Sequence, residues 1–310
     1  MKLSLHSIVS VAALVGLCVA PTTFAATGEV TLSGSTWTGK VDGTTKYTGS
    51  SLAAAANACV AAMSSGTVNI RNSGSTSQIT IKSNVKVNGN GVTLTGSGTG
   101  GIVRATNSSS TGCDNIKMAG DAWFGMYFST CQGTAFSSTH GTSGIAYRID
   151  NCKGGGGSNF TFGTVNLTSG GDNGVETYGI NGVTWNTVNA TDRGACGMLL
   201  NYSSNAKGTA VNGTRCNYGG GYAGFRTANT NTSTTLGTVT SNTCGRGYFS
   251  VSGSNNCTVS TVNATNCSSH GVWLQTAANT KVNAGTVTNC HPCSSISTDN
   301  GGNSIKVTCK

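Results

Sequence analysis

The chain has 310 residues, with 46 glycines, only two prolines, 9% charged residues and a formal net charge of +9. Hydrophobic residues make up 36% and aromatic residues 6%, unlike the leucine-rich composition of a helical domain. Disordered chains carry more proline and charge, and collagens place glycine at every third position, so both classes are excluded. The dominant serine, threonine, asparagine, glycine and valine favour an all-β chain of short strands and tight turns.

The first 25 residues have the features of a secretory signal peptide. Lys2 precedes an apolar run over residues 8–20, and small residues occupy the cleavage positions within 23–25. The run is too short to cross a bilayer, and no later segment approaches the roughly eighteen apolar residues that a membrane span needs. We therefore predict a signal peptide over 1–25 and one mature domain over 26–310. We expect the mature protein to be secreted, extracellular and monomeric, without contact to a membrane.

An alanine-rich segment near the start of the mature chain, Ser51 to Met63, begins at a Ser-Ser pair and contains no glycine or proline. This composition predicts a short helix. We expect the helix to cover the open end of a repetitive β structure, where unpaired strand edges would otherwise promote aggregation. Strand-like segments follow at Gly66-Thr-Val-Asn-Ile and from Ile79 to Leu94.

The C-terminal half of the sequence repeats. Each unit opens with Thr-Val-Asn or a close variant and then reaches a glycine that leads a strand-like segment, such as Gly224-Phe-Arg-Thr-Ala. The steps between successive units are 23, 23, 28, 23 and 25 residues. The units open at Thr164, Thr187, Ala210, Thr238, Thr261 and Thr286.

A step of about 23 residues predicts one coil of a β-solenoid, because two or three short strands separated by turns fill that length. Leucine-rich repeats have a similar length, but their leucine scaffold is absent here, and propeller blades need roughly 40 residues or more. The frequent Asn-x-Thr sequons follow from the same repeat and make the protein a candidate glycoprotein. Equivalent residues meet in stacked coils, so we expect an amide ladder along Asn166, Asn189, Asn212 and Asn263.

The N-terminal segments resemble the start of pectin-lyase-like right-handed parallel β-helices. The likeness lies in the helix, in the Gly-Thr-Val-x-Ile strand at Gly66, and in the Ser-Asn-Val-x-Val-x-Gly-x-Gly pattern of residues 83–91. The resemblance implies an all-β, single-stranded right-handed parallel β-helix of about ten coils with a short N-terminal capping helix. Pectate and pectin lyases, rhamnogalacturonan-degrading enzymes and polygalacturonases belong to this superfamily, which implies an activity on polysaccharides.

Twelve cysteines remain after Cys18 leaves with the signal peptide, and an even number in an exported chain favours disulfides over free thiols. Cys216, Cys244 and Cys267 each lie six residues after the start of their unit. Adjacent coils lie about 4.8 Å apart, so one neighbouring pair of these three can be bridged. The Cys-His-Pro-Cys sequence at 290–293 lacks the βαβ context of a redox motif, and we expect a disulfide or a tight turn there.

The net charge of +9, or +8 once Lys2 is removed with the signal peptide, indicates an anionic partner. Lysine and arginine are scattered singly, with no basic run and no interleaved aromatic residues, which argues against nucleic acid. An acidic polysaccharide suits an exported protein better, and we predict it as the partner.

Strand alternation separates two faces of each glycine-led segment. The first and third residues after the glycine are mostly apolar and should point inward. The second residues form an outward column of Glu176, Leu199, Arg226, Phe249 and Trp273. The fourth positions add Tyr178 and Asn201, and the residues that enter the strands add Asp172, Asn173, Arg193, Tyr222, Arg246 and His270.

These residues suit β-elimination in a uronic-acid polymer, which needs a base to remove the proton beside the carboxyl group and a cation to stabilise the enolate. Arg226 and Arg246 are the predicted cations; His270, Tyr178 or an arginine of lowered pKa is the predicted base. The predicted catalytic residues are Glu176, Arg226, Arg246 and His270. The predicted substrate-binding residues are Asp172, Asn173, Tyr178, Arg193, Asn201, Tyr222 and Trp273. Because cations outnumber carboxylates, the sequence favours a polysaccharide lyase.

Two alternatives stay open. A glycoside hydrolase of the same fold can use Asp172 and Glu176 as its two carboxylates, although the polygalacturonase motifs are absent and Ser269-His270-Gly271 resembles one of them only weakly. The clustered aspartates of calcium-dependent pectate lyases do not stand out either, so we assign no metal ligands and leave calcium open as a cofactor. A non-catalytic wall-binding or adhesion protein is the second alternative. Ice binding is disfavoured because the outward column lacks a threonine ladder.

Overall fold

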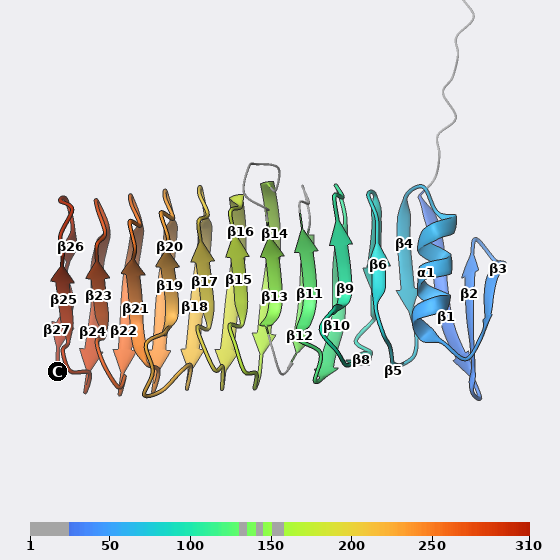
Figure 1. Ribbon diagram of the computed structural model, residues 1–310, viewed down its shortest axis with the longest axis horizontal. Helices are drawn as coiled ribbons and strands as arrows, with labels where there is room; N and C mark the ends of the chain where they lie inside the picture. Colours follow the sequence, from blue (N-terminus) through green and yellow to red (C-terminus); the bar gives the residue numbers. More distant parts are fainter. Residues whose placement is uncertain (1–24, 130–134, 141–144, 151–157) are drawn as a thin grey trace, which may run out of the picture.

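The structure, a computed structural model, describes residues 25–129, 135–140, 145–150 and 158–310. These residues form a β-solenoid of about nine turns whose coils stack side by side along one axis (Figure 1). The prediction of an all-β, right-handed parallel β-helix is confirmed, and the number of coils is close to the predicted ten. Residues 1–24 of the predicted signal peptide lie outside the described residues. The one helix within the described ranges is too short to cross a membrane.

The N-terminal end of the solenoid begins with three strands that the sequence did not predict. Strand β1 (Ala26–Ser33) pairs antiparallel with β2 (Thr36–Val41), which pairs antiparallel with β3 (Thr44–Gly49). Strand β1 also pairs in parallel with β4 (Gly66–Ile70), the strand expected from the Gly-Thr-Val-Asn-Ile sequence. The antiparallel strands therefore extend the edge of the first coil.

The predicted capping helix is confirmed as α1 (Leu52–Ala62), which lies across this end of the solenoid (Figure 1). The side chain of Ser51 caps the helix by accepting a hydrogen bond from the backbone N–H of Ala54 at 3.1 Å. Alanines let the helix pack closely against the end of the coil stack, and its buried residues are Leu52, Ala53, Ala55, Ala56, Cys59 and Val60.

One parallel sheet, sheet B, contains the glycine-led segments of the repeat. Ten described strands pair in consecutive coils, and in Figure 1 most of them run upwards across the front. They are β6 (Ile79–Ile81), β9 (Gly101–Thr106), β11 (Phe124–Ser129), β13 (Ile145–Asp150), β15 (Val175–Tyr178), β17 (Met198–Asn201), β19 (Ala223–Ala228), β21 (Arg246–Val251), β23 (Val272–Gln275) and β25 (Ser294–Ser297).

The second sheet, sheet A, contains the Thr-Val-Asn segments. The coils at the N-terminal end contribute two short strands each, and β10 pairs with both β7 and β8. Single longer strands follow from β10 to β24, which in turn pairs with the two short strands β26 and β27. Besides β1 to β4, its strands are β5 (Gly74–Ser75), β7 (Val85–Asn88), β8 (Thr93–Gly96), β10 (Gly112–Gly120), β12 (Ala135–His140), β14 (Ser158–Leu167), β16 (Asn181–Thr191), β18 (Lys207–Thr214), β20 (Thr235–Asn242), β22 (Thr258–Thr265), β24 (Lys281–Thr288), β26 (Ser304–Ile305) and β27 (Thr308–Cys309).

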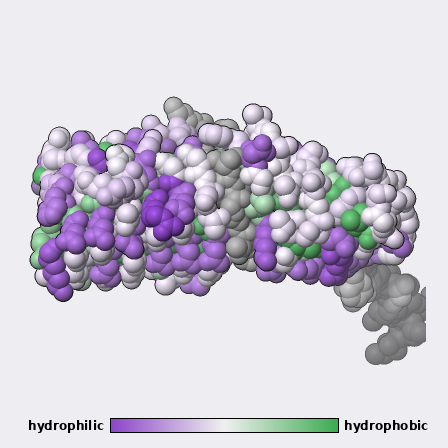
Figure 2. Space-filling model, turned by 90° about the horizontal axis from the view of Figure 1, so that it is seen from below, coloured by the Kyte–Doolittle hydropathy of each residue, from purple (hydrophilic) through white to green (hydrophobic). Residues whose placement is uncertain are grey.

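Like residues stack in the interior between the two sheets. Trp185 stacks on Phe162 with ring centroids 6.0 Å apart, and Phe225 stacks on Tyr248 at 5.6 Å. Residues one and three positions after each repeat glycine are buried, as predicted for the inward positions. On the face seen in Figure 2, residues of intermediate hydropathy and hydrophilic residues dominate, and hydrophobic residues appear only in small patches.

The expected amide ladder is present over three coils. The side-chain amide of Asn189 donates to the Oδ1 of Asn166 at 2.7 Å, and that of Asn212 donates to Asn189 at 2.8 Å. Thr240 occupies the next place in this register and separates Asn263 from the ladder. The longer 28-residue step therefore coincides with a break in the ladder.

The predicted bridge within the cysteine column is not formed. Cys216, Cys244 and Cys267 are free thiols, buried at equivalent positions of successive coils, where they pack as small apolar side chains. The alternative of buried thiols therefore holds for most of the described cysteines. The free ones are Cys59, Cys113, Cys196, Cys216, Cys244, Cys257, Cys267 and Cys290. Cys131 and Cys152 lie outside the described residues.

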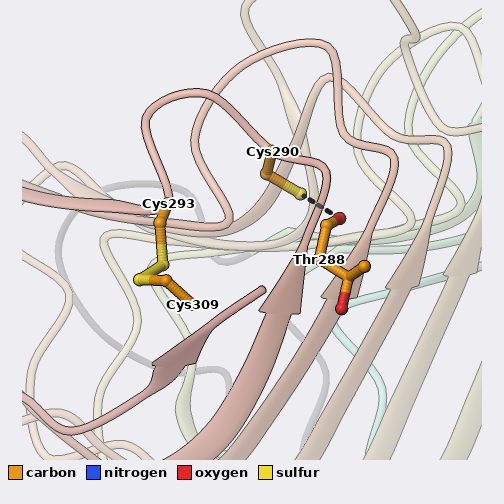
Figure 3. Close-up of a disulfide and its surroundings, with 4 residues drawn as sticks. All are labelled: Thr288, Cys290, Cys293 and Cys309. Atoms are coloured by element: carbon orange, nitrogen blue, oxygen red, sulfur yellow. Dashed lines mark hydrogen bonds between the residues drawn. A yellow bond between two sulfur atoms is a disulfide. The ribbon is translucent and has the colours of Figure 1, made fainter.

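The single disulfide among the described residues joins Cys293 to Cys309 and attaches the last strand to the turn before β25 (Figure 3). The Cys-His-Pro-Cys sequence thus forms a turn, and only its second cysteine is bridged. Cys290 stays a thiol that donates to the carbonyl oxygen of Thr288 at 3.4 Å (Figure 3). The disulfide crosslinks the last coil, which has no further coil to pair with in the described chain.

Candidate functional site

The outward column predicted from strand alternation exists and is longer than expected. In the strand register of sheet B, Glu176 pairs with Leu199, and Leu199 pairs with Arg226. Phe249 and Trp273 occupy the next two places. Arg148 precedes Glu176 in the same register. The column therefore places charged and aromatic side chains on consecutive coils, about 4.8 Å apart along the axis.

A surface pocket of about 380 Å³ lies over β15, β17 and β19. It brings together six of the predicted site residues, namely Asp172, Asn173, Glu176, Asn201, Tyr222 and Arg226. Sequence reasoning had assigned no role to the other residues that line it, which are Leu199, Ala228 and Asn229. Two carboxylates, three amides, one phenol and one guanidinium thus converge in a space that suits a sugar residue.

Glu176 lies at the base of this pocket and is only 6% exposed. One carboxylate oxygen forms an ion pair with the guanidinium of Arg148, and the other accepts a hydrogen bond from the amide of Asn173 at 3.1 Å. The Oδ1 of Asn173 in turn accepts the backbone N–H of Cys196 at 2.9 Å. These contacts fix the position of the Glu176 carboxylate before any ligand binds.

Arg193 is a correction to the predicted site. Its side chain is 1% exposed and occupies the interior place that cysteines hold in the following coils, so it cannot reach a ligand in the pocket. The guanidinium instead donates to the carbonyl oxygens of Thr168, Asp172 and Asn173 at 2.8–3.1 Å. Burial lowers the pKa of Arg193 to about 10. Arg193 therefore supports the segment that carries Asp172 and Asn173 from beneath.

The irregular 28-residue step of the repeat has a structural cause in this site. Its extra residues form a loop, residues 217–222, that lies beside the pocket. Asn217 holds the loop by donating to the carbonyl oxygen of Gly194 and accepting the N–H of Tyr222. Gly219 donates to the hydroxyl of Ser268, two coils further along the chain. The loop thereby places Tyr222 in the pocket lining.

Gly245 shows how closely this loop approaches the coil beneath it. A Cβ at this position would lie 2.6–2.7 Å from the carbonyl oxygens of Asn217, Gly220 and Tyr222. A side chain there would displace the loop, so glycine is required for the close approach.

A continuous arginine–aromatic stack extends from the pocket towards the C-terminal end. The guanidinium of Arg226 lies between the rings of Tyr222 and Phe249, at 5.2 and 5.1 Å from their centroids. Arg246 follows, at 4.5 Å from Phe249 and 4.7 Å from Trp273. His270 ends the stack, its ring parallel to Trp273 with centroids 4.5 Å apart. We call these six residues the arginine–aromatic stack.

The two arginines of the stack carry positive charge without a neutralising partner. In the described part of the chain, no carboxylate forms an ion pair with Arg226 or Arg246, whereas Arg71, Arg148 and Arg215 each have one. The Nε atoms of Arg226 and Arg246 are buried and have no hydrogen-bond partner. Burial and the nearby charge of Arg226 lower the pKa of Arg246. Two uncompensated cations on neighbouring coils form a strong anion-binding element.

His270 is suited to act as a base. Burial, and to a lesser degree the charge of Arg246, lower its pKa below the usual 6.5, so the imidazole is neutral at pH 7. One ring nitrogen, Nδ1, lies 2.9 Å from the hydroxyl of Ser269. His270 and Arg246 lie outside the pocket lining, so the predicted catalytic residues are divided between the pocket and the distal part of the stack.

The two other predicted binding residues also lie outside the pocket lining. Tyr178 packs under the guanidinium of Arg148 at 5.2 Å and against the ring of Tyr202. Trp273 is half-buried in the stack and donates its indole N–H to the hydroxyl of Ser297 at 2.8 Å. Both therefore shape the surface next to the pocket.

Sequence reasoning missed Arg148 and Asn229. Asn229 adopts a φ of 52° in a turn and donates to the Oδ1 of Asn201 at 2.7 Å, which orients that amide in the pocket. The sequence Gly144-Ile-Ala-Tyr-Arg resembles the glycine-led segments of the repeat less regularly, and Arg148 ends it. That place in the repeat was the signal that could have identified Arg148.

Across the residues that the structure describes, no three His, Cys, Asp or Glu side chains gather as metal ligands.

Comparisons with known proteins agree on the fold. No protein-family model and no curated protein sequence matches the chain. The enzymatically active domain of tailspike protein 2 from bacteriophage CBA120 superposes with a TM-score of 0.54 at 14% identity, over 76% of this chain and 40% of the tailspike chain. This chain therefore spans less than half of that domain's length.

Two further solved structures match less closely. The A-module of a mannuronan C-5 epimerase from Azotobacter vinelandii has a TM-score of 0.46 at 13% identity, over 84% of this chain and 94% of the module. The catalytic unit of a GH87 α-1,3-glucanase from Streptomyces thermodiastaticus has a TM-score of 0.45 at 15% identity, over 84% and 67% of the two chains. The tailspike domain, the one of these three with a TM-score above 0.5, shares the parallel β-helix fold of this protein.

Proposed function

We propose that the protein is a polysaccharide lyase that binds an acidic polysaccharide along the outward face of sheet B. The observation that carries this proposal is the pair of arginines in the stack, Arg226 and Arg246. They lie on neighbouring coils, contact aromatic rings and have no carboxylate partner among the described residues. Two like charges held together favour an anionic ligand, and successive carboxylates of a uronic-acid polymer supply such charges at a regular spacing.

The reaction that fits this arrangement is β-elimination. A uronate carboxylate bound by Arg246 lies next to His270, whose neutral imidazole removes the proton beside the carboxyl group. Arg246 stabilises the resulting enolate. The enolate then expels the neighbouring sugar oxygen, which takes a proton from solvent, and a carbon–carbon double bond remains on the uronate. Arg226 binds the next carboxylate, and Glu176 and Asn201 accept and donate hydrogen bonds to hydroxyl groups in the pocket.

The tailspike domain that shares the fold is described as enzymatically active, which agrees with an enzyme rather than a purely adhesive protein. We also propose that the protein is exported, because the predicted signal peptide precedes the β-helix and polysaccharides of this kind lie outside cells.

Hydrolysis is the second candidate function, and one observation favours it. Asp172 and Glu176 both line the same pocket, as a pair of hydrolytic carboxylates would. The ion pair of Glu176 with Arg148 weighs against this role, because a general acid must be able to hold and release a proton.

A panel of uronic-acid polymers and neutral glucans tests the proposal. The purified protein is incubated with each polymer, and absorbance of the unsaturated product is followed together with the release of reducing ends. We expect both signals with at least one uronic-acid polymer and neither with the glucans. Reducing ends without unsaturated product would show that the protein is a hydrolase and not a lyase. Binding without either signal would indicate an adhesion protein.

The pH dependence of the reaction provides a more specific prediction for His270. Because the lowered pKa keeps the imidazole neutral at pH 7, activity should persist at neutral pH and fall only when the pH drops below the usual histidine range. In the Arg246→Met variant the repulsive charge is lost, so the pKa of His270 should rise, as followed by NMR titration of its ring protons. Arg215→Met, which removes an exposed arginine elsewhere, should leave it unchanged.

A further inference from the structure

We infer that the polysaccharide-binding surface has a second anion-binding anchor at its N-terminal end, centred on the guanidinium of Arg104. The ligand class is a single chain of a polyanionic polysaccharide long enough to reach from Arg104 to Arg226. This inference rests on the proposed function, because it assigns the same strip of sheet B to one extended substrate.

The strand register places the two arginines in one column. Arg104 pairs with Tyr127, and Tyr127 pairs with Arg148, which precedes Glu176. Leu199 and Arg226 occupy the next two places. The column is therefore continuous across β9, β11, β13, β15, β17 and β19. Arg104 and Arg226 are separated by five coil steps, or about 24 Å at about 4.8 Å per step.

The surroundings of Arg104 repeat the chemistry of the stack. Its guanidinium lies 4.9 Å from the ring centroid of Tyr127, and Tyr127 stacks on Phe124 at 4.8 Å. Trp123 packs edge-on against Phe124 and is 45% exposed, an unusual exposure for a tryptophan. An arginine beside exposed aromatic rings can bind a carboxylate while the rings contact the apolar faces of sugars.

The arginines at the two ends of the column differ in their pairing from the arginine between them. Arg104, like Arg226, forms no ion pair with a carboxylate in the described part of the chain. Arg148, which lies between them, is neutralised by Glu176. A polyanion on this surface therefore meets a positive charge at each end of a stretch of the column in which the charges of Arg148 and Glu176 cancel.

This spacing makes a prediction about substrate length. A short oligomer can occupy either anchor but cannot bridge them, whereas a longer chain contacts both, so that its second contact forms at a high effective concentration. The protein should therefore prefer polymers to short oligomers and cleave them internally.

The test compares binding of short and long probes, namely galacturonate and mannuronate oligomers of about three and about ten sugars. Affinities are measured by calorimetry under conditions in which cleavage is negligible. For at least one series, Arg104→Ala should weaken binding of the long oligomer about tenfold and leave binding of the short oligomer at the Arg226 end nearly unchanged. Lys117→Ala, which removes an exposed charge from the opposite sheet, is the matched control.

Three outcomes would overturn the second anchor: no effect of Arg104→Ala on long oligomers, an equal effect on short ones, or an equal effect of Lys117→Ala. Thermal unfolding of the variants shows whether the fold is intact. A length-dependent effect of Arg104→Ala without cleavage of any polymer would support the anchor and contradict the lyase, so the two proposals can fail separately.

Discussion

Replacing Arg226 with alanine is expected to lower kcat/KM on the acidic polysaccharide by about 10- to 10²-fold, because it removes a charged contact of about 1.5–3 kcal/mol to the carboxylate next to the reacting uronate. Arg226 lines the pocket and lies between Tyr222 and Phe249 in the arginine–aromatic stack, so a polysaccharide bound along the strip would meet it in both regions. The half-buried side chain makes no ion pair with any described carboxylate, and its loss should therefore leave folding largely unaffected.

The control for this experiment is Arg215→Ala. Arg215 is exposed, pairs with Asp192 outside the pocket lining, and should be dispensable for activity. Arg226→Lys keeps the charge but loses the planar fork that binds a carboxylate through two hydrogen bonds, and should recover only part of the activity. Full activity of Arg226→Ala would show that the outward column is not the substrate surface.

Replacing Glu176 with glutamine is expected to have the largest combined effect on stability and activity. The Glu176 carboxylate is 6% exposed and holds both Arg148 and the amide of Asn173. Its neutral replacement breaks the ion pair with the largely buried guanidinium of Arg148, and breaking a buried ion pair should cost about 3–5 kcal/mol of unfolding free energy. Denaturant unfolding of the purified variant measures this loss.

The double variant Glu176→Gln with Arg148→Gln separates the two roles of Glu176. With both partners of this ion pair replaced by neutral side chains, most of the lost stability should return. Activity should not return, because the pocket still lacks the carboxylate that binds the substrate. Recovery of activity together with stability would instead assign Glu176 a purely structural role.

The repeat predicted most of the fold. The glycine-led segments and the Thr-Val-Asn segments became sheet B and sheet A, because period-two alternation and a recurring step of 23 to 28 residues favour stacked coils. The three strands β1 to β3 were not predicted, since they lie outside the repeat and have no partner within the sequence pattern. The cysteine column was misjudged because position alone does not distinguish a bridged pair from stacked apolar thiols.

Part of the candidate site was also predicted from the alternation of side chains along the strands. Alternation identified the outward residues Glu176 and Arg226, but it cannot report how deeply a side chain is buried. Arg193 lies inside the coil, although it precedes a strand as the half-buried Arg246 does. The N-terminal part of the column was missed because the steps there are irregular. Yet Gly125-Met-Tyr-Phe-Ser follows the same alternation as the later units, and it was the signal that could have found Tyr127.

The loop at residues 217–222 is a place where the sequence can change without changing the strand pairing of the solenoid. Two of its side chains contact the coils: Asn217 donates to the carbonyl oxygen of Gly194, and the ring of Tyr222 packs against the guanidinium of Arg226. Gly219 and Gly220 contact the coils through backbone groups, and Tyr218 is 62% exposed. Its length and side chains can therefore change while the strand register on either side of it is kept. Changes in this loop would therefore alter the lining of the pocket, where Tyr222 lies, and leave the core of the solenoid intact.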